Sequence, residues 1–336
     1  MLAPHHVCSA RENAIPFSGA PGGQRRNLAT NYNATVVGRV EAAPGLMSLS
    51  VEPDKMPFEF EPGQYVVLGL KASESRVEEA EVDEPGVVAG DESSGTPESR
   101  AAVAAQSATA RQAAADPDRL ILRAYNIVSD LRATSSLEFY VTLILSGELT
   151  PRLFNLKVGD RLYVGPKAQG VFTLDKWSTK SVLMIATGTG LAPYMSMIRN
   201  ELMLRVDGRL GLRATLQRNG SRQFVVVHGA RHSWDLGYRT ELTGLARQIA
   251  NFHYMPLITR PAEDPTWRGA SGYLQDFVAS GLVEKEARVA LTPDNFDVLL
   301  CGNPDMVDSM VAWAEARGFA QASGDQIGTL HAEKYW

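Results

Sequence analysis

An apolar run that ends at two glycines, Val182-Leu-Met-Ile-Ala-Thr-Gly-Thr-Gly-Leu-Ala-Pro193, constrains the fold of this chain more than any other segment. Its continuous apolar part, Val182 to Ala186, is typical of a parallel strand buried on both faces. Gly188 and Gly190 permit a sharp turn and a close approach to a ligand, and Pro193 fits the first turn of a helix. The segment predicts a strand, a turn and a helix N-terminus facing an anion. Taken alone, it also fits a tight structural turn without a ligand.

Strands and helices alternate after this segment. We expect strands at 182–186, 224–228, 254–259 and 296–301, and helices from 193 onward and at 240–249, 273–280 and 305–315. Such alternation predicts a doubly wound α/β domain with a parallel sheet over residues 176–336.

The preceding part of the chain, residues 31–175, has short alternating β-branched segments that predict an antiparallel β-barrel. The expected strands cover 34–41, 46–51, 64–70, 120–128, 137–145, 161–164 and 170–174, with a short helix ending at 156. Residues 71–118 are acidic and rich in Ser, Gly and Pro, then rich in Ala, so we interpret them as a low-complexity insertion. Residues 1–30 are expected to form a disordered leader.

Composition excludes several classes of function. The net charge is −5 and the Lys and Arg residues are scattered, which argues against a nucleic-acid surface or a basic membrane-binding face. No apolar run is long enough to span a bilayer. The two cysteines, Cys8 and Cys301, provide neither a disulfide framework nor a cysteine metal cluster, so we expect no metal site and a reducing cytoplasm.

The order of motifs across both expected domains resembles the ferredoxin–NADP reductase family, in particular its bacterial members that end in an aromatic pair. The resemblance covers residues 33–336 apart from the insertion. The segment Arg123-Ala124-Tyr125-Asn126 is similar to the family's Arg-x-Tyr-Ser. It implies that Arg123 binds the pyrophosphate of FAD and that Tyr125 faces the isoalloxazine ring. Asn126 stands where the family has a serine near flavin N5, and its amide is expected to donate there.

The resemblance implies further FAD contacts in four other segments. These are Tyr140, Val141 and Thr142; the turn of Gly147, Glu148, Leu149 and Thr150; Thr189; and the C-terminal Ala332, Tyr335 and Trp336. In the turn, backbone N–H groups at a helix start would hold the pyrophosphate. Two simpler interpretations stay open: Thr150 before Pro151 as an ordinary helix cap, and the terminal aromatics as core closure.

The resemblance also implies a site for NADP(H) in the second domain. Its expected contacts are Gly188, Thr189, Gly190, Cys301, Gly302 and Asn303 beside the nicotinamide nucleotide, Arg231 and Arg260 on the 2′-phosphate, and Tyr238 on the adenine. A third arginine of the family is missing, because Tyr273 stands at its position, and Arg268 is the nearest substitute. Each strand-end arginine is equally consistent with a solvated surface charge, and Cys301 with a buried core thiol.

The resemblance therefore implies a FAD-dependent ferredoxin/flavodoxin–NADP reductase that transfers hydride between NADPH and flavin N5, with Tyr125, Asn126 and Cys301 shaping that contact. It also implies single-electron exchange with ferredoxin or flavodoxin, and we expect a cytoplasmic monomer. The missing third arginine favours one alternative, an NAD(P)H-dependent reductase component of an oxygenase system. Asn126 favours another, a nonenzymatic flavin or nucleotide sensor.

Overall fold

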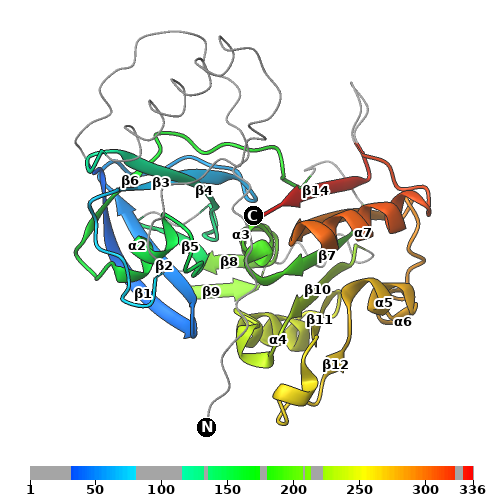
Figure 1. The fold of residues 1–336 in the computed structure, drawn as a ribbon. Helices are drawn as coiled ribbons and strands as arrows, with labels where there is room; N and C mark the ends of the chain where they lie inside the picture. Colours follow the sequence, from blue (N-terminus) through cyan, green and yellow to red (C-terminus); the bar gives the residue numbers. More distant parts are fainter. Residues whose placement is uncertain are drawn as a thin grey trace, which may run out of the picture.

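The computed structural model of this protein describes residues 32–80, 116–131, 135–174, 180–206, 209–212, 222–321 and 328–335. The expected leader, most of the insertion and Trp336 lie outside these residues. Figure 1 shows two lobes, a barrel from the N-terminal half and an α/β layer structure from the C-terminal half. Residues 175–179 also lie outside the described part, so a domain boundary at 175/176 stays a prediction.

The first lobe is a six-stranded antiparallel barrel, as the sequence predicts. Its strands are β1 (Ala34–Ala43), β2 (Leu46–Pro53), β3 (Tyr65–Lys71), β4 (Leu120–Asn126), β5 (Leu137–Thr142) and β6 (Arg161–Val164), in the order β4-β3-β6-β1-β2-β5. A single bridge between Ile127 and Phe139 joins the two end strands. Alternate residues of each strand point inward into one core, which the short helix α2 (Thr150–Asn155) also enters through Leu153 and Phe154.

Two barrel predictions were wrong in detail. The fifth strand ends at Thr142, because the chain turns where the Gly147 N–H donates to the carbonyl of Ile144. Residues 170–174 form no strand, and pairing there is limited to one bridge between Gln169 and Tyr65. Gly170 has φ 104°, which ends the extended conformation just after that bridge.

The second lobe contains a six-stranded parallel sheet in the order β12-β11-β10-β7-β13-β14. The strands are β7 (Ser181–Thr187), β10 (Phe224–Ala230), β11 (Phe252–Ile258), β12 (Ala270–Ser271), β13 (Phe296–Gly302) and β14 (Leu330–Lys334), and a separate hairpin holds β8 (Met203–Val206) and β9 (Arg209–Leu212). The helices are α3 (Ala192–Leu202), α4 (Arg239–Gln248), α5 (Leu274–Ala279), α6 (Leu282–Ala287) and α7 (Pro304–Glu315), with the single turns η1 (Gly188–Leu191), η3 (Ser233–Asp235) and η4 (Pro261–Glu263).

Helices cover both faces of this sheet, which confirms the doubly wound prediction. In β7, Met184 faces the layer of α3 and α4, whereas Leu183 and Ile185 face the layer of α5, α6 and α7. The sequence did not predict α6, β8, β9, β12 or β14. The residues of β14 are mostly polar, so this strand depends on its pairing with β13 and not on local β-propensity.

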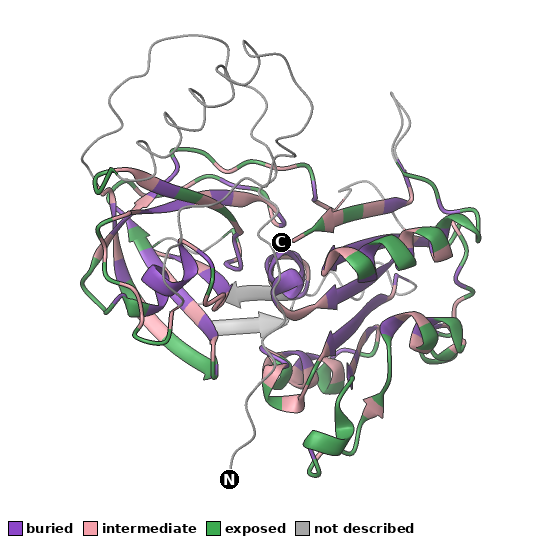
Figure 2. Cartoon of the chain, in the orientation of Figure 1, coloured by how far each residue is buried: buried purple, intermediate pink, exposed green. Residues whose placement is uncertain are grey.

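The two lobes share part of one core. Ala43, Leu46, Val128, Tyr140 and Phe172 of the barrel belong to the same buried cluster as α3 and α4. Figure 2 shows the buried residues continuing from the barrel strands into α3 and the central strands. No helix in the described part of the chain is long and apolar enough to cross a membrane.

Candidate functional site

The glycine turn after β7 lies against the end of the neighbouring strand β13. A Cβ on Gly190 would lie 2.3 Å from the carbonyl oxygen of Cys301, and one on Gly302, whose φ is 134°, would lie 2.2 Å from Thr187 Oγ1. The N–H of Asn303 donates to the same Oγ1 at 2.8 Å. Close packing of two strand ends therefore already explains both glycines, while their contact with a nucleotide stays a prediction.

The turn leads directly into helix α3. Gly188 has φ 53° and opens η1, in which Thr189 is buried, and Pro193 lies in the first turn of α3 as the sequence predicts. Beneath this turn, His228 is completely buried, and burial lowers its pKa to about 4. The imidazole is therefore neutral at physiological pH.

A group of buried polar side chains occupies the junction between the lobes. Asn126 Nδ2, at the end of β4, donates to the carbonyl of Gly63 at 3.1 Å and to Glu333 Oε2 of β14 at 3.3 Å. The Tyr335 hydroxyl donates to the same Glu333 oxygen at 3.4 Å. Burial raises the pKa of the Glu333 carboxyl, and it raises the pKa of the Cys301 thiol well above its usual range, so the thiol is protonated at physiological pH.

The Asn126 amide therefore has two protein acceptors, Gly63 and Glu333, and its expected contact with flavin N5 stays a prediction. Glu333, which lies between the expected contact residues Ala332 and Tyr335, was not predicted from the sequence. The signal was a carboxylate next to Ala332 in a segment expected to contact the flavin. Ala332 itself is exposed, on the opposite side of β14.

The end of β4 presents Arg123 and Tyr125 on one side of the strand and the exposed Ala124 on the other. Arg123 Nη2 lies 3.2 Å from Glu148 Oε2, and Arg119 Nη2 lies 2.5 Å from Glu148 Oε1. Burial acts to raise the pKa of the Glu148 carboxyl, but hydrogen bonds and charge from the two arginines lower it overall. Glu148 is therefore an ionised carboxylate held between two guanidinium groups.

The turn from Gly147 to Thr150 differs from the helix-cap interpretation, while its binding of the pyrophosphate stays a prediction. Helix α2 begins at Thr150 with Leu149 as its N-cap, and no side chain caps it. The Thr150 hydroxyl instead accepts from the Ile144 N–H at 3.0 Å and donates to the Ile144 carbonyl at 3.1 Å. Thr150 therefore closes the loop in front of the helix, and it is not an ordinary helix cap.

The described start of the insertion packs on this same turn. Arg76 Nη2 donates to the carbonyls of Leu145 and Gly147 at 3.0 and 3.2 Å. The N–H of Val77 donates to the carbonyl of Pro151 at 3.2 Å. The insertion thus starts beside the segment expected to bind the pyrophosphate, a proximity with no local signal in the sequence.

Strand β5 contains three residues that were expected to contact FAD, and the structure places them in different surroundings. Val141 is completely buried in the barrel core and Thr142 is half-buried. The ring of Tyr140 meets the ring of Tyr238 edge-on, with centroids 5.0 Å apart. The Tyr238 hydroxyl donates to Glu138 Oε1 at 2.7 Å.

Tyr238 therefore connects the two lobes. It is the N-cap of α4 with φ 55°, and the guanidinium of Arg199 from α3 lies 5.2 Å from its ring centroid. Arg199 also pairs with Glu138 at 2.7 Å and with Glu241 at 2.8 Å. The resemblance implies that Tyr238 contacts adenine, whereas the structure places its hydroxyl and one side of its ring in the contact between lobes.

The two strand-end arginines lie together, as neighbouring parallel strands require. The N–H of Arg260 donates to the carbonyl of Arg231 at 3.0 Å, and both residues are exposed. Arg260 Nη1 lies 3.5 Å from Glu263 Oε2, which also lies 2.9 Å from His232 Nε2. Arg268 donates to the carbonyls of Pro265 and Trp267, so its guanidinium is held by its own loop.

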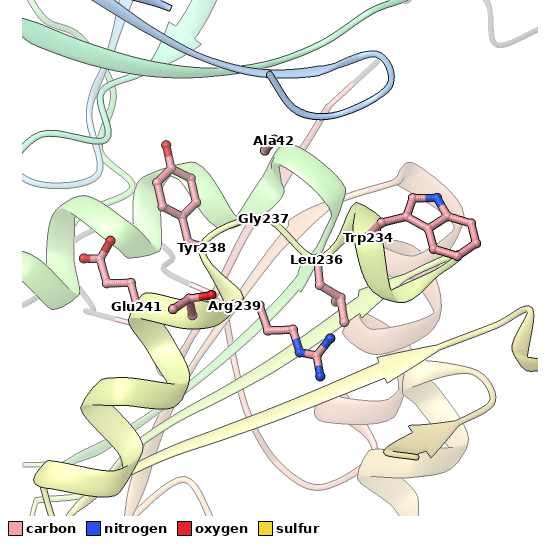
Figure 3. Close-up of a pocket in the computed structure, with 8 residues that line it drawn as sticks. Ala42, Trp234, Leu236, Gly237, Tyr238, Arg239 and Glu241 are labelled. Atoms are coloured by element: carbon pink, nitrogen blue, oxygen red, sulfur yellow. The ribbon is translucent and has the colours of Figure 1, made fainter. Parts of the chain in front are cut away.

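A pocket of about 340 Å³ opens between η3 and the start of α4 (Figure 3). Its lining residues are Ala42 of β1 together with Trp234, Leu236, Gly237, Tyr238, Arg239, Thr240 and Glu241. None of these residues except Tyr238 was expected at a site from the sequence.

Comparison with known proteins identifies the family. Residues 184–312 match the model of the oxidoreductase NAD-binding domain. The chain is 32% identical over 222 residues to the ferredoxin–NADP reductase B of Sorangium cellulosum, covering 65% of this chain and 80% of that protein. This chain belongs to the ferredoxin–NADP reductase family.

Other members of the ferredoxin–NADP reductase family agree with this. A flavodoxin/ferredoxin–NADP reductase of Buchnera aphidicola is 29% identical over 222 residues, covering 65% of this chain and 82% of that protein. The solved structure of a ferredoxin NADP⁺ reductase from Neisseria gonorrhoeae with bound FAD and NADP has a TM-score of 0.64 at 19% identity. The alignment covers 90% of this chain and 97% of that one, so the two proteins share the two-lobed fold.

Proposed function

We propose that this protein is a FAD-dependent ferredoxin–NADP reductase, which transfers hydride between NADPH and flavin N5 and exchanges single electrons with ferredoxin or flavodoxin. The observation that carries the proposal is the junction where Asn126 of the barrel meets Glu333 of β14. There the carboxyl ends of β7 and β13, at which open α/β sheets bind ligands, face the barrel strand that contains Tyr125.

The residues around Glu148 fit the diphosphate of FAD. Arg119 and Arg123 converge on one carboxylate, and a guanidinium pair donates to phosphate oxygens in the same geometry. The Nε of Arg119 is buried without a hydrogen-bond partner among the described residues, so it has an unused donor. Arg123 and Arg119 would hold the diphosphate, and Tyr125 would face the flavin ring.

The residues at the ends of β10 and β11 fit a phosphorylated nucleotide. Arg231 and Arg260 are exposed and adjacent, as binding of the 2′-phosphate of NADPH requires. The glycine turn at 188–190, together with Cys301, Gly302 and Asn303, would lie beside the nicotinamide end. Arg268 is a weaker candidate, since its guanidinium is already bonded to two carbonyls.

Bound FAD supplies the hydride acceptor and converts a two-electron donor into single electrons. The chain's own residues orient the reactants and set the local charge. Burial raises the pKa of the Cys301 thiol well above its usual range and also raises the pKa of the Glu333 carboxyl. An uncharged Cys301 thiol beside the nicotinamide would add no negative charge where hydride is transferred.

The electron partner, the cellular setting and the oligomeric state are proposals as well. Ferredoxin or flavodoxin is the proposed partner, since relatives are named for both, and we place the protein in the cytoplasm as a monomer. A second candidate function, an NADH-using reductase component, is favoured by Tyr273 at the third arginine position and by Glu263 beside Arg260.

Anaerobic visible spectra, recorded before and after adding NADPH or NADH, test the proposed function. We expect a bound-flavin spectrum that bleaches faster with NADPH than with NADH. Bleaching by NADH alone would favour the oxygenase-reductase alternative. A flavin that bleaches but passes no electrons to an artificial acceptor would favour the sensor, and failure to bind FAD would refute the proposal.

A further inference from the structure

We propose that Arg199 is a positioning residue for hydride transfer, because it holds the lobe that would bind the nicotinamide against the lobe that would bind the flavin. The inference rests on the proposed function and adds a residue outside both cofactor sites. Arg199 lies on α3, the helix that follows the glycine turn, and Figure 1 shows this helix between the barrel and the parallel sheet. Its partner in the barrel is Glu138 of β5, with 2.7 Å between Arg199 Nη1 and Glu138 Oε2.

Glu138 is the barrel carboxylate on which contacts from the α/β lobe converge. Its Oε2 accepts from Arg199, and its Oε1 accepts from the Tyr238 hydroxyl at 2.7 Å, so both oxygens are bonded to the other lobe. The Ser48 hydroxyl of β2 donates to the same Oε1 at 2.8 Å and orients the carboxylate. Burial acts to raise the pKa of the Glu138 carboxyl, but the charge of Arg199 and the hydrogen bonds lower it overall, so the group is ionised at physiological pH.

A second contact joins the same helix to the loop that follows β4. Ser196 lies one turn before Arg199, and its hydroxyl donates to the Ser129 carbonyl at 2.6 Å, with both residues buried. Arg199 Nη1 also donates to the carbonyl of Val128 at 3.3 Å. This loop follows the strand that contains Tyr125, the residue expected at the flavin ring. Helix α3 therefore begins at the turn expected beside the nicotinamide and is bonded to the segment that follows the expected flavin contact.

This arrangement makes hydride transfer sensitive to the Arg199 contact. Arg199 is about 10 Å along α3 from its first residue, Ala192. A misplacement of about 1 Å between reacting atoms can cost about a hundredfold in rate. The side chains of Arg199 and Glu138 are only 17% and 24% exposed, so solvent screens their attraction less than that of a surface pair. Losing this ion pair should therefore alter the distance between the two rings more than it alters the binding of either cofactor.

Glu241 provides a matched control, because it is bonded to the same guanidinium but lies in the same lobe as Arg199. Its carboxylate oxygens accept from Arg199 Nε and Nη2 at 2.8 Å each. The Glu241 side chain is 28% exposed, compared with 24% for Glu138. Glu138→Gln and Glu241→Gln thus each remove one charge from beside Arg199 at a similar depth, and only Glu138→Gln weakens the contact between the lobes.

The test measures single-turnover reduction of the flavin in the FAD-loaded full chain at saturating NADPH, by anaerobic stopped-flow absorbance. A primary isotope effect with NADPH deuterated at the transferred position identifies the observed step as hydride transfer. We expect Arg199→Met to slow this step about tenfold, Glu138→Gln about fivefold and Glu241→Gln less than about twofold. Arg199→Lys, which keeps the charge, should recover part of the rate. The Kd values of FAD and NADP⁺, and the rate of flavin reduction by dithionite, should each change less than about twofold, because none depends on the distance between the rings.

Hydrogen exchange of the FAD-loaded chain without nucleotide measures the contact between the lobes independently of activity. We expect the backbone amides of residues 127–131 to exchange faster in Arg199→Met and Glu138→Gln, since the loop loses its hold on α3. Glu241→Gln should leave the exchange of residues 127–131 unchanged.

Three results would overturn the inference. One is an unchanged rate of hydride transfer in Arg199→Met, and another is equal slowing by Glu138→Gln and Glu241→Gln, which would indicate a general loss of stability. The third is a slowing that disappears at saturating NADPH, because Arg199 would then act on nucleotide binding. Thermal melting checks folding, and if Arg199→Met does not fold, the two glutamine variants decide. Failure of the proposed function is distinguishable, since NADPH would then not reduce the flavin of the unsubstituted chain, while the difference in hydrogen exchange would remain.

Discussion

At each of the two expected phosphate sites, one carboxylate is shared by two basic side chains, but the site in the barrel is more deeply buried. In the barrel, Glu148 is shared by Arg119 and Arg123, whose side chains are 29% and 30% exposed. In the α/β lobe, Glu263 is shared by Arg260 and His232, and the Arg260 side chain is 48% exposed. Charges are screened less as they are buried, so the barrel site should hold its ligand more tightly. That difference suits a resident flavin in one lobe and an exchanging nucleotide in the other.

The largest effect should come from removing a cation at the deeper site. Arg123→Met deletes charged hydrogen bonds worth about 2 kcal/mol, so we expect the Kd of FAD to rise roughly thirtyfold. Fluorescence titration of the deflavinated protein with FAD measures this. Arg161→Met, which breaks a barrel ion pair with Asp54 elsewhere, is the control. An equal loss in both variants would mean that general barrel damage is responsible.

Adding a cation at the shallower site should have the next largest effect. Tyr273 is 66% exposed and follows β12, the strand beside β11. Tyr273→Arg should therefore raise the preference for NADPH over NADH about tenfold, measured as the ratio of kcat/KM values. Tyr273→Gln, which replaces the ring by a flexible polar chain without charge, should leave the ratio unchanged. A rise for both cofactors alike would contradict a role at the 2′-phosphate.

Removing the carboxylate at the deeper site should change FAD binding and folding stability in opposite directions. Glu148→Gln frees two guanidinium groups, so we expect FAD to bind about fivefold more tightly. At pH 7 the free energy of unfolding of the deflavinated variant should be about 0.5 kcal/mol lower than that of the deflavinated unsubstituted protein, after allowance for solvent screening. Because its pKa is lowered in the folded state, Glu148 stabilises the fold above its unfolded pKa and loses that effect as pH falls.

Melting temperatures measured against pH check this prediction. The difference in stability between the deflavinated protein and Glu148→Gln should be present at pH 7, begin to shrink near the ordinary pKa of a glutamate, about 4.3, and vanish as pH falls through the lower folded-state pKa. A constant difference across this range would show that the ionised carboxylate is not the cause.

The smallest effect should come from removing the carboxylate at the shallower site. Glu263→Gln should lower the Kd of NADPH about twofold, because the charge it removes is exposed and screened. Flavin difference spectra in low salt measure this, and the effect should disappear at high salt. An effect larger than that of Glu148→Gln on FAD would reverse the comparison between the two sites.

The sequence predicted what depends on local patterns. Alternating residues identified the barrel strands, and the run before Gly188 identified β7 and the start of α3. The pairing of Arg231 with Arg260 was foreseeable too, because the carboxyl ends of neighbouring parallel strands meet at one edge.

The rest depends on contacts between distant segments. Nothing near Asn126 indicates that its amide donates to Glu333, and nothing near Arg76 indicates that it reaches Gly147. The mostly polar strand β14 exists because β13 pairs with it, and Trp234 gains its setting from the stack on His232. Tertiary contacts override local propensity at these positions, so a linear pattern does not reveal them.

The bond between Asn126 and Glu333 joins residues separated by 207 positions. During translation, the barrel strand that carries Asn126 therefore leaves the ribosome long before its partner exists. At about 5–20 residues per second, roughly 10 to 40 seconds separate the two. A partly made chain cannot assemble this junction. The junction between the lobes is therefore completed only when the last residues of the chain have been made.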